Sequence, residues 1–136
     1  MRKKIVVIDG QGGKIGAQLI TAIREKCAEA EIIAIGTNSI ATANMLKSSP
    51  DAAATGENPV IVACRDADFI VGPIGIVIAD SLYGEVTPAI STHIGQSSAQ
   101  RVLIPVNKCD SFVAGVGNPP LSALIKEAAE HIASSF

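Results

Sequence analysis

The sequence is poor in aromatic side chains and has no excess of positive charge. Its 136 residues include no tryptophan and one tyrosine, and aromatic residues make up 3% of the chain. Lysine and arginine total 11 against 13 aspartate and glutamate residues. The chain therefore lacks the excess of positive charge that attracts proteins to a phosphate backbone. Proteins that hold nucleic-acid strands combine a positive groove with stacked aromatic rings. We therefore expect no nucleic-acid partner.

Cysteine is scarce and unpaired. Cys27, Cys64 and Cys109 form no C-x-x-C pair, and their number is odd, which argues against a disulfide framework. The first apolar run starts at Ile5 and ends at Asp9, so it reads as a strand and not as a secretory signal. We expect a reduced, cytoplasmic setting. No cysteine and histidine spacing resembles a zinc or iron site, so we expect no metal.

Long apolar runs and a dense charged surface are also missing. The longest apolar stretch, residues 69–79, is broken by glycine and proline and falls short of the roughly 20 residues of a membrane helix. Charged residues make up 18% of the chain and hydrophobic residues 48%. We expect one domain, residues 1–136, that does not enter a membrane. We also expect a homo-oligomer that covers part of the apolar surface.

The chain does contain short β-branched segments that alternate with amphipathic helical patterns. Strands are expected at residues 4–8, 31–35, 68–71, 101–106 and 111–116. Helices are expected at residues 15–27, 40–47, 60–65 (where a strand is the alternative), 76–82, 87–99 and from 118 onward, with residues 52–57 as a loop. The alternation predicts an α/β fold with three layers, in which helices cover both faces of a mostly parallel sheet of about five strands, as in Rossmann-like proteins.

A glycine-rich loop joins the first expected strand to the first expected helix. Gly10 and Gly12 permit a tight turn and the close approach of a ligand. Gly13 begins the helix, whose free amides attract anions, and Lys14 adds a positive charge. Gly16 lies one turn further, where a missing side chain lets the helix pack closely on the sheet. The expected phosphate contacts are Gly10, Gln11, Gly12, Gly13, Lys14 and Ile15.

The spacing of this loop is G-x-G-G-x-x-G, and a P-loop would require serine or threonine where Ile15 stands. The loop is therefore a candidate site for the phosphates of a nucleotide or dinucleotide, and the alternative is a tight turn without a ligand. The ligand hypothesis depends on amides of Gly12 and Gly13 that point into an open cleft.

Two further segments follow expected strands and so reach the same edge of the sheet. Thr37 and Asn38 are placed to bind a ribose, or else to cap the next helix. Gly72, Pro73, Ile74 and Gly75 either form the second wall of the site or make a rigid turn. The apolar run from Ile76 to Ala79 is either core or the seam of a dimer.

Four ionisable residues outside these segments have different expected roles. Asp9 is expected to cap amides of its own loop, the alternatives being contact with magnesium, a ribose hydroxyl or a ligand amine. Cys109 beside Lys108 is expected to be an ordinary loop residue, with a nucleophile as the alternative. His93 is expected to be a surface or packed residue. His131 suits the negative end of the last helix.

The stretch KKIVVIDGQGGKIGAQLI, residues 3–20, resembles the opening of dihydrodipicolinate reductases. The resemblance covers about the first thirty residues and implies a dinucleotide loop, with NAD or NADP as the candidate cofactor. Those enzymes carry an acidic residue at the end of the second strand, where this chain has Gly36, Thr37 and Asn38. Their substrate-binding domain and histidine-containing catalytic motif are absent.

A second resemblance spans nearly the whole chain. The motifs VIDGQGG, IAIGTN, ATGEN, GPIG, GEVTP and LIPVNKC are similar to those of a family of short bacterial proteins known only as a domain of unknown function. The resemblance implies a Rossmann-like fold with a ligand site and no established activity. Three functions stay open: a nucleotide-binding module, a small oxidoreductase completed by an oligomer or partner subunit, and a structural protein without a ligand.

Overall fold

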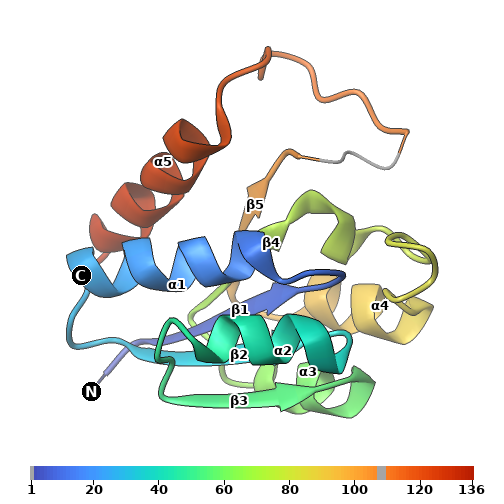
Figure 1. Ribbon diagram of the computed structural model, residues 1–136, viewed down its shortest axis with the longest axis horizontal. Coiled ribbons are helices and arrows are strands. Elements are labelled where there is room, and N and C mark those ends of the chain that lie inside the picture. Colours follow the sequence, from blue (N-terminus) through green and yellow to red (C-terminus); the bar gives the residue numbers. More distant parts are fainter. Residues whose placement is uncertain (1, 107–109) are drawn as a thin grey trace.

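The computed structural model describes residues 2–106 and 110–136 and is a three-layer α/β fold (Figure 1). Five parallel strands form one sheet in the order β3-β2-β1-β4-β5. The strands are β1 (Lys4–Asp9), β2 (Glu31–Gly36), β3 (Ala52–Thr55), β4 (Phe69–Pro73) and β5 (Gln100–Ile104). The helices are α1 (Lys14–Lys26), α2 (Ser39–Leu46), α3 (Glu57–Ala63), α4 (Pro88–Gln96), α5 (Leu121–Ala133) and the 3-10 helix η1 (Ile74–Val77). The predicted fold class is confirmed.

The order of the strands places a crevice beside β1. From β1 the chain adds β2 and then β3 on one side, and it later returns to add β4 and β5 on the other side. In the register of the sheet, Lys4 of β1 lies opposite Glu31 of β2, and Ile5 of β1 lies opposite Phe69 of β4. In open parallel sheets, ligands bind where this reversal separates the loops at the carboxyl ends of two strands. Here that point lies between β1 and β4.

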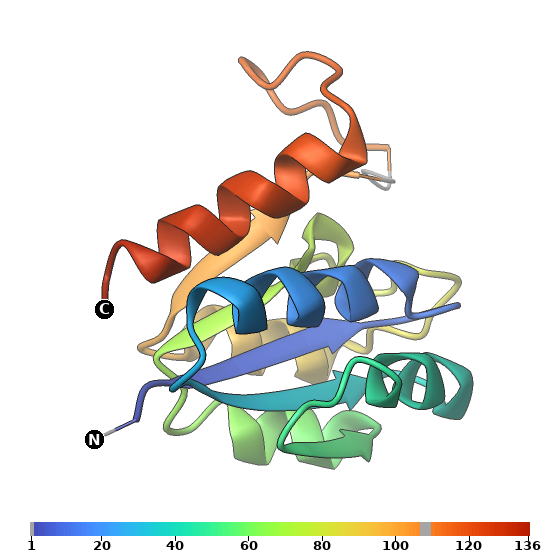
Figure 2. The ribbon, with the colours of Figure 1, turned by 60° about the vertical axis from the view of Figure 1, so that its left-hand side comes forward.

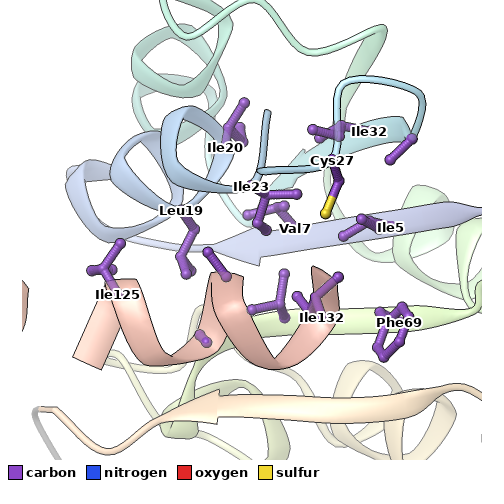
Figure 3. Close-up of a cluster of buried hydrophobic side chains, with 14 of the residues drawn as sticks. Ile5, Val7, Leu19, Ile20, Ile23, Cys27, Ile32, Phe69, Ile125 and Ile132 are labelled. Carbon is purple, nitrogen blue, oxygen red and sulfur yellow. The ribbon is translucent and has the colours of Figure 1, made fainter. Parts of the chain in front are cut away.

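Helices cover both faces of the sheet (Figures 1 and 2). On one face, α1 and α5 meet above the central strands, where Leu19, Ile23, Ile125 and Ile132 form part of one apolar cluster (Figure 3). On the other face, α3 and α4 form a second cluster with β1 and β4. Within the described residues, no helix has both the length and the apolar character needed to cross a membrane.

Three of the expected assignments were wrong, and two of them concern strands. Residues 52–57 contain the edge strand β3, whose Ala52 pairs with Ile33 of β2. Alanine has a low β-propensity, so this strand exists because a neighbour pairs with it and not because of its own sequence. Residues 111–116 are irregular, with a turn at 114–116, and contain no strand. The sheet therefore has the expected number of strands, with β3 in place of that segment.

The expected helix at 76–82 was also wrong, because only the short η1 precedes a series of turns. Asp80, Leu82 and Tyr83 have positive φ values of 66°, 56° and 56°, a conformation in which no right-handed helix continues. Ile76 is fully buried, so the run that begins there belongs to the core at this position.

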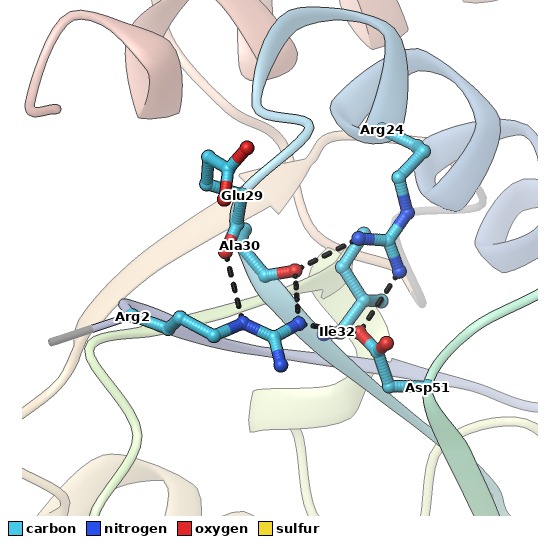
Figure 4. A network of polar contacts seen from close by, with 6 residues as sticks. All are labelled: Arg2, Arg24, Glu29, Ala30, Ile32 and Asp51. Atoms are coloured by element: carbon cyan, nitrogen blue, oxygen red, sulfur yellow. Dashed lines mark hydrogen bonds and ion pairs between the residues drawn. The ribbon is translucent and has the colours of Figure 1, made fainter.

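A polar network ties together the amino edge of the sheet (Figure 4). The carboxylate of Asp51 accepts hydrogen bonds from the Ile32 amide at 2.8 Å and from the Arg24 guanidinium at 2.9 Å. Arg24 and Arg2 both donate to the carbonyl oxygen of Ala30, at 2.8 and 3.1 Å. The Ile32 amide, followed by Arg24, lowers the pKa of Asp51. The network therefore joins the end of α1 to β2 and to the start of β3.

We expect Asp51→Ala to lower the free energy of unfolding by about 1–2 kcal/mol, because a carboxylate at this half-exposed position satisfies an amide and a guanidinium. A lowered pKa in the folded state means that this contribution is complete above the unfolded-state pKa of 3.8 and is lost as the pH falls through the folded value. Urea titrations at pH 3 and pH 6 should therefore show a smaller deficit at pH 3.

Asp66→Ala is the matched control. Its carboxylate pairs with Lys4 at 2.8 Å but is 70% exposed, so water replaces the lost partner. We expect this variant to stay within about 0.5 kcal/mol of the wild type. Equal losses in the two variants would contradict a special role for the Asp51 network.

Candidate functional site

The loops that follow β1, β4 and β5 enclose a cavity of about 270 Å³ at the carboxyl edge of the sheet. Its position matches the crevice between β1 and β4 that the strand order creates. The lining residues are Asp9, Gly10, Gln11, Gly12, Gly13, Lys14, Ile15, Pro73, Gly75, Leu82 and Val106.

Eight of the twelve predicted site residues line this cavity: the six of the glycine-rich loop together with Pro73 and Gly75. Gly72 and Ile74 do not line it. Gly72 is buried within β4, and a Cβ there would overlap the carbonyl oxygen of Ile8. Thr37 and Asn38 also lie outside the lining and hydrogen-bond to Glu85.

The glycines of the loop have different physical roles. Gly13 is the N-cap of α1 with φ 71°, and a Cβ there would lie 2.6 Å from the carbonyl oxygen of Ala41. A Cβ on Gly16 would lie 2.5 Å from the Met45 sulfur, so the close packing expected of Gly16 is against α2 as well as the end of β1. A Cβ on Gly12 would meet no described atom within 4 Å. Gly12 alone among these three faces open space.

Asp9 caps its own loop, as expected. The residue is 4% exposed, and its two carboxylate oxygens accept from the Gly10 amide at 2.8 Å and the Gly16 amide at 2.7 Å. Burial raises the pKa of this carboxyl, and the nearby Glu85 carboxylate raises it further, while the amides of Gly16, Gly10 and Ile15 act in the opposite direction. The carboxylate thus occupies the first turn of α1 that an anion would otherwise approach.

A second carboxylate reaches the loop from a distant part of the chain. Oε1 of Glu85 accepts from the Gln11 amide at 2.8 Å, the Thr37 hydroxyl at 2.7 Å and the Asn38 side chain at 2.8 Å. Partial burial alone would raise the pKa of Glu85, but these three donors outweigh it and hold the pKa below its usual value. Glu85 is therefore a charged anchor between the ends of β1 and β2.

The remaining free donors are few. The Gly13 amide donates to the Gly10 carbonyl oxygen at 2.9 Å, so the expectation that it points freely into a cleft was wrong. The amides of Gly12 and Lys14 have no hydrogen-bond partner among the residues that the structure covers. Lys14 is exposed and is the first residue of α1. Gly12 and Lys14 both line the cavity, so these two amides and the Lys14 ammonium group are the candidate donors for an anion there.

Two asparagines hold the carbonyl side of the loop. Asn44 of α2 donates to the Gly12 carbonyl oxygen at 2.5 Å, and Asn38 donates to that of Gln11 at 3.0 Å. The Asn38 side-chain oxygen also accepts from the Ala41 amide at 2.8 Å, so the helix-capping alternative for this residue is confirmed. These bonds hold the loop in one conformation, so a ligand bound there would not have to order it.

Sequence reasoning missed Glu85, Asn44, Leu82 and Val106. Glu85 lies 74 residues after Gln11, and no local pattern connects the two. The GEVTP motif contained Glu85, but a motif alone assigns no contact. Asn44 sits inside a helix, where it resembled an ordinary polar surface residue.

The other reactive side chains lie away from the cavity. Cys27 and Cys64 are buried free thiols, and burial raises the pKa of Cys64 to about 11. His93 lies 2.8 Å from the Ala89 carbonyl oxygen on α4, and His131 lies in the last turn of α5, as expected. The candidate nucleophile Cys109, with Asn107 and Lys108, lies outside the described residues.

The chain was compared with curated proteins, with solved structures and with models of protein families. No curated protein matches the sequence. A dodecameric FMN-dependent Ubix-like decarboxylase from Escherichia coli O157:H7 is similar at 14% identity and a TM-score of 0.46, over 98% of this chain and 93% of that one. A nucleoside-diphosphate-sugar epimerase from Pseudomonas aeruginosa is similar at 13% identity and a TM-score of 0.48, over 97% of this chain and 47% of that one. A model of a domain of unknown function, DUF3842, matches residues 4–136, so the chain belongs to that family.

Proposed function

We propose that the protein binds the phosphate of a nucleotide or related small molecule in the cavity between β1 and β4. The phosphate would lie against the amides of Gly12 and Lys14, with the Lys14 ammonium group beside it. The rest of the ligand would extend toward Pro73, Gly75 and Val106, which line the opposite side of the cavity.

The observation that carries this proposal is the coincidence of an open cavity with the reversal point of the sheet. In this crevice α1 presents its positive end, and the amides of Lys14, its first residue, and of Gly12, two residues earlier, have no partner among the described residues. A cavity of about 270 Å³ is close to the lower end of the range of small-molecule sites.

The carboxylates limit which anions are suitable. Asp9 and Glu85 each satisfy amides of the loop, so a phosphate competes with negative charge already in place. Binding must therefore come from the phosphate contacts together with apolar contact to the body of the ligand. We expect nucleotides to bind more tightly than inorganic phosphate.

A thermal-shift panel with NAD, NADP, FAD, ATP, AMP and inorganic phosphate, with and without magnesium, tests the proposal. A ligand at a hundred times its dissociation constant should add about 2.7 kcal/mol to the free energy of unfolding. Failure of every compound to shift the transition, confirmed by calorimetry, would favour the structural alternative, in which the glycines serve turning and packing.

Gly12→Val should lower the affinity for any compound that binds by about tenfold or more, because its side chain projects into the space that a phosphate needs. The protein has no described atom within 4 Å of the new Cβ, so the fold should be retained. Isothermal titration calorimetry measures the change.

Gly95→Val is the control, since Gly95 lies on α4 and its added Cβ also meets nothing within 4 Å. It should bind as the wild type does. Equal affinity of Gly12→Val and the control for the ligand would place the ligand elsewhere.

The proposal includes a homo-oligomer in the cytoplasm. Large apolar side chains remain exposed in the monomer, among them Ile40 at 66%, Tyr83 at 99% and Phe112 at 89%. Association would remove such surface from water. Gel filtration with light scattering tests the oligomer, and cell fractionation tests the location.

A further inference from the structure

A strap, residues 78–87, runs from the end of η1 to the start of α4 and lies beside the glycine-rich loop. In Figures 1 and 2 this yellow segment and the blue loop after β1 lie side by side at the same end of the sheet. Leu82 of the strap lines the cavity, and Glu85 is bonded to Gln11. The strap therefore borders the site on the side of β2.

Glu85 occupies the place that a second nucleoside would need. In parallel sheets that bind dinucleotides, one ribose lies at the carboxyl end of the strand next to β1, beside the glycine-rich turn. Here that position corresponds to Thr37 and Asn38, and both donate to Glu85 Oε1, at 2.7 and 2.8 Å. The donors that a ribose or its adjoining phosphate would use are therefore engaged by the protein itself.

The strap also covers the backbone at Gly10. A Cβ on Gly10 would lie 2.7 Å from the Leu82 Cδ1, 2.9 Å from the Glu85 Oε1 and 2.6 Å from the Thr37 hydroxyl. No space remains above this glycine for a diphosphate to pass toward β2. The opening that remains is the cavity on the side of β4.

Internal bonds hold the strap in this shape. Asp80 and Val86 are joined by a 2.7 Å hydrogen bond from the Asp80 amide to the Val86 carbonyl oxygen, and the Ser81 hydroxyl donates to the carbonyl oxygen of Gly75. Val86 is fully buried, and Thr87 caps α4. The positive φ values of Leu82 and Tyr83 carry strain that only such surrounding contacts maintain. The strap is thus a formed wall of the site.

We infer that the site takes a ligand with one phosphate and one body, typified by a nucleoside monophosphate, and excludes a dinucleotide. The inference rests on the proposed function. The phosphate meets Gly12 and Lys14, the body fills the cavity toward β4, and Glu85 closes the path that a second nucleoside would take over Gly10.

Calorimetric titration of the wild-type protein with AMP, nicotinamide mononucleotide, NAD and inorganic phosphate tests the inference. We expect at least one monophosphate to bind about tenfold or more tightly than NAD, although NAD contains both monophosphates. NAD affinity equal to or above that of the monophosphates would overturn the inference and leave the proposed function intact. Absence of binding by all four compounds would overturn both.

Two variants locate the cause of the selectivity. Glu85→Ala should reduce the ratio of monophosphate affinity to NAD affinity by about tenfold, because Thr37 and Asn38 become available to a ribose. Glu85→Ser also removes the Oε1 acceptor, since its side chain is too short to reach Thr37 and Asn38, and it provides the same test if the alanine variant unfolds. Glu29→Ala, which removes an exposed carboxylate at the opposite edge of the sheet, should keep the wild-type ratio. An unchanged ratio in folded Glu85 variants would overturn the role of the strap.

Discussion

Gly72→Ala should lower the free energy of unfolding by about 3 kcal/mol or more, although it adds a single methyl group. A Cβ at this position would overlap the carbonyl oxygen of Ile8 in β1. Neither strand can yield, because Gly72 is paired with Leu103 of β5 and Ile8 is paired with Ile35 of β2. Urea denaturation followed by circular dichroism measures the loss.

Gly95→Ala provides the matched control for the same chemical change. Gly95 lies within α4, and its added Cβ would meet no described atom within 4 Å. Alanine at such a helical position should raise stability by about 0.5–1 kcal/mol. A Gly72→Ala protein as stable as the wild type would show that β1 and β4 lie further apart than the structure has them.

The two glycines of the GPIG motif show what a glycine pattern in the sequence can and cannot predict about a binding site. In the sequence, Gly72 and Gly75 looked alike, as two glycines of one GPIG motif after a strand. Gly75 lines the cavity, whereas Gly72 is needed for the close approach of two strands. A sequence records that a side chain is absent and does not record what would occupy its place. Only the neighbouring strand distinguishes a binding glycine from a packing glycine.

The fold was predictable because its main strands are continuous apolar runs. The segments at β1, β2, β4 and β5 were recognised from β-branched composition, and α1 from apolar residues at helical spacing. β3 was missed because its residues, alanine and threonine, carry little pattern of their own. The η1 segment was misread because its apolar residues suggested a helix, while the positive φ values that follow depend on distant contacts.

The candidate site was predictable on the β1 side and in part on the β4 side, where Pro73 and Gly75 line the cavity. The glycine-rich loop and the cap by Asp9 involve residues at most seven positions apart in the sequence, so local rules sufficed. Glu85 enters from a strap 74 residues further along, and it changes the meaning of Thr37 and Asn38 from ligand donors to partners of a carboxylate. Long-range pairing of this kind leaves no periodic trace in one sequence.

Asp9→Ala should be the second severe variant, with an expected loss of about 2–4 kcal/mol. Its carboxylate accepts from the buried amides of Gly10 and Gly16, and alanine would leave both donors without their acceptor at a buried position. Urea denaturation over a range of pH measures the loss. A variant within about 0.5 kcal/mol of the wild type would show that these amides find other partners.

The control for Asp9→Ala is Asp68→Ala, whose carboxylate accepts from the Lys4 amide at 2.8 Å in an exposed position. Water can replace that acceptor, so we expect a loss of about 0.5–1 kcal/mol.

The pH dependence of stability distinguishes the Asp9 variant from the Asp51 variant. Because the folded-state pKa of Asp9 is raised above 3.8, its contribution is complete below that pH and declines as the pH rises through the folded value. The deficit of Asp9→Ala should therefore shrink with rising pH, while that of Asp51→Ala grows. Parallel slopes would mean that Asp9 is not the desolvated carboxyl on which the geometry of the loop depends.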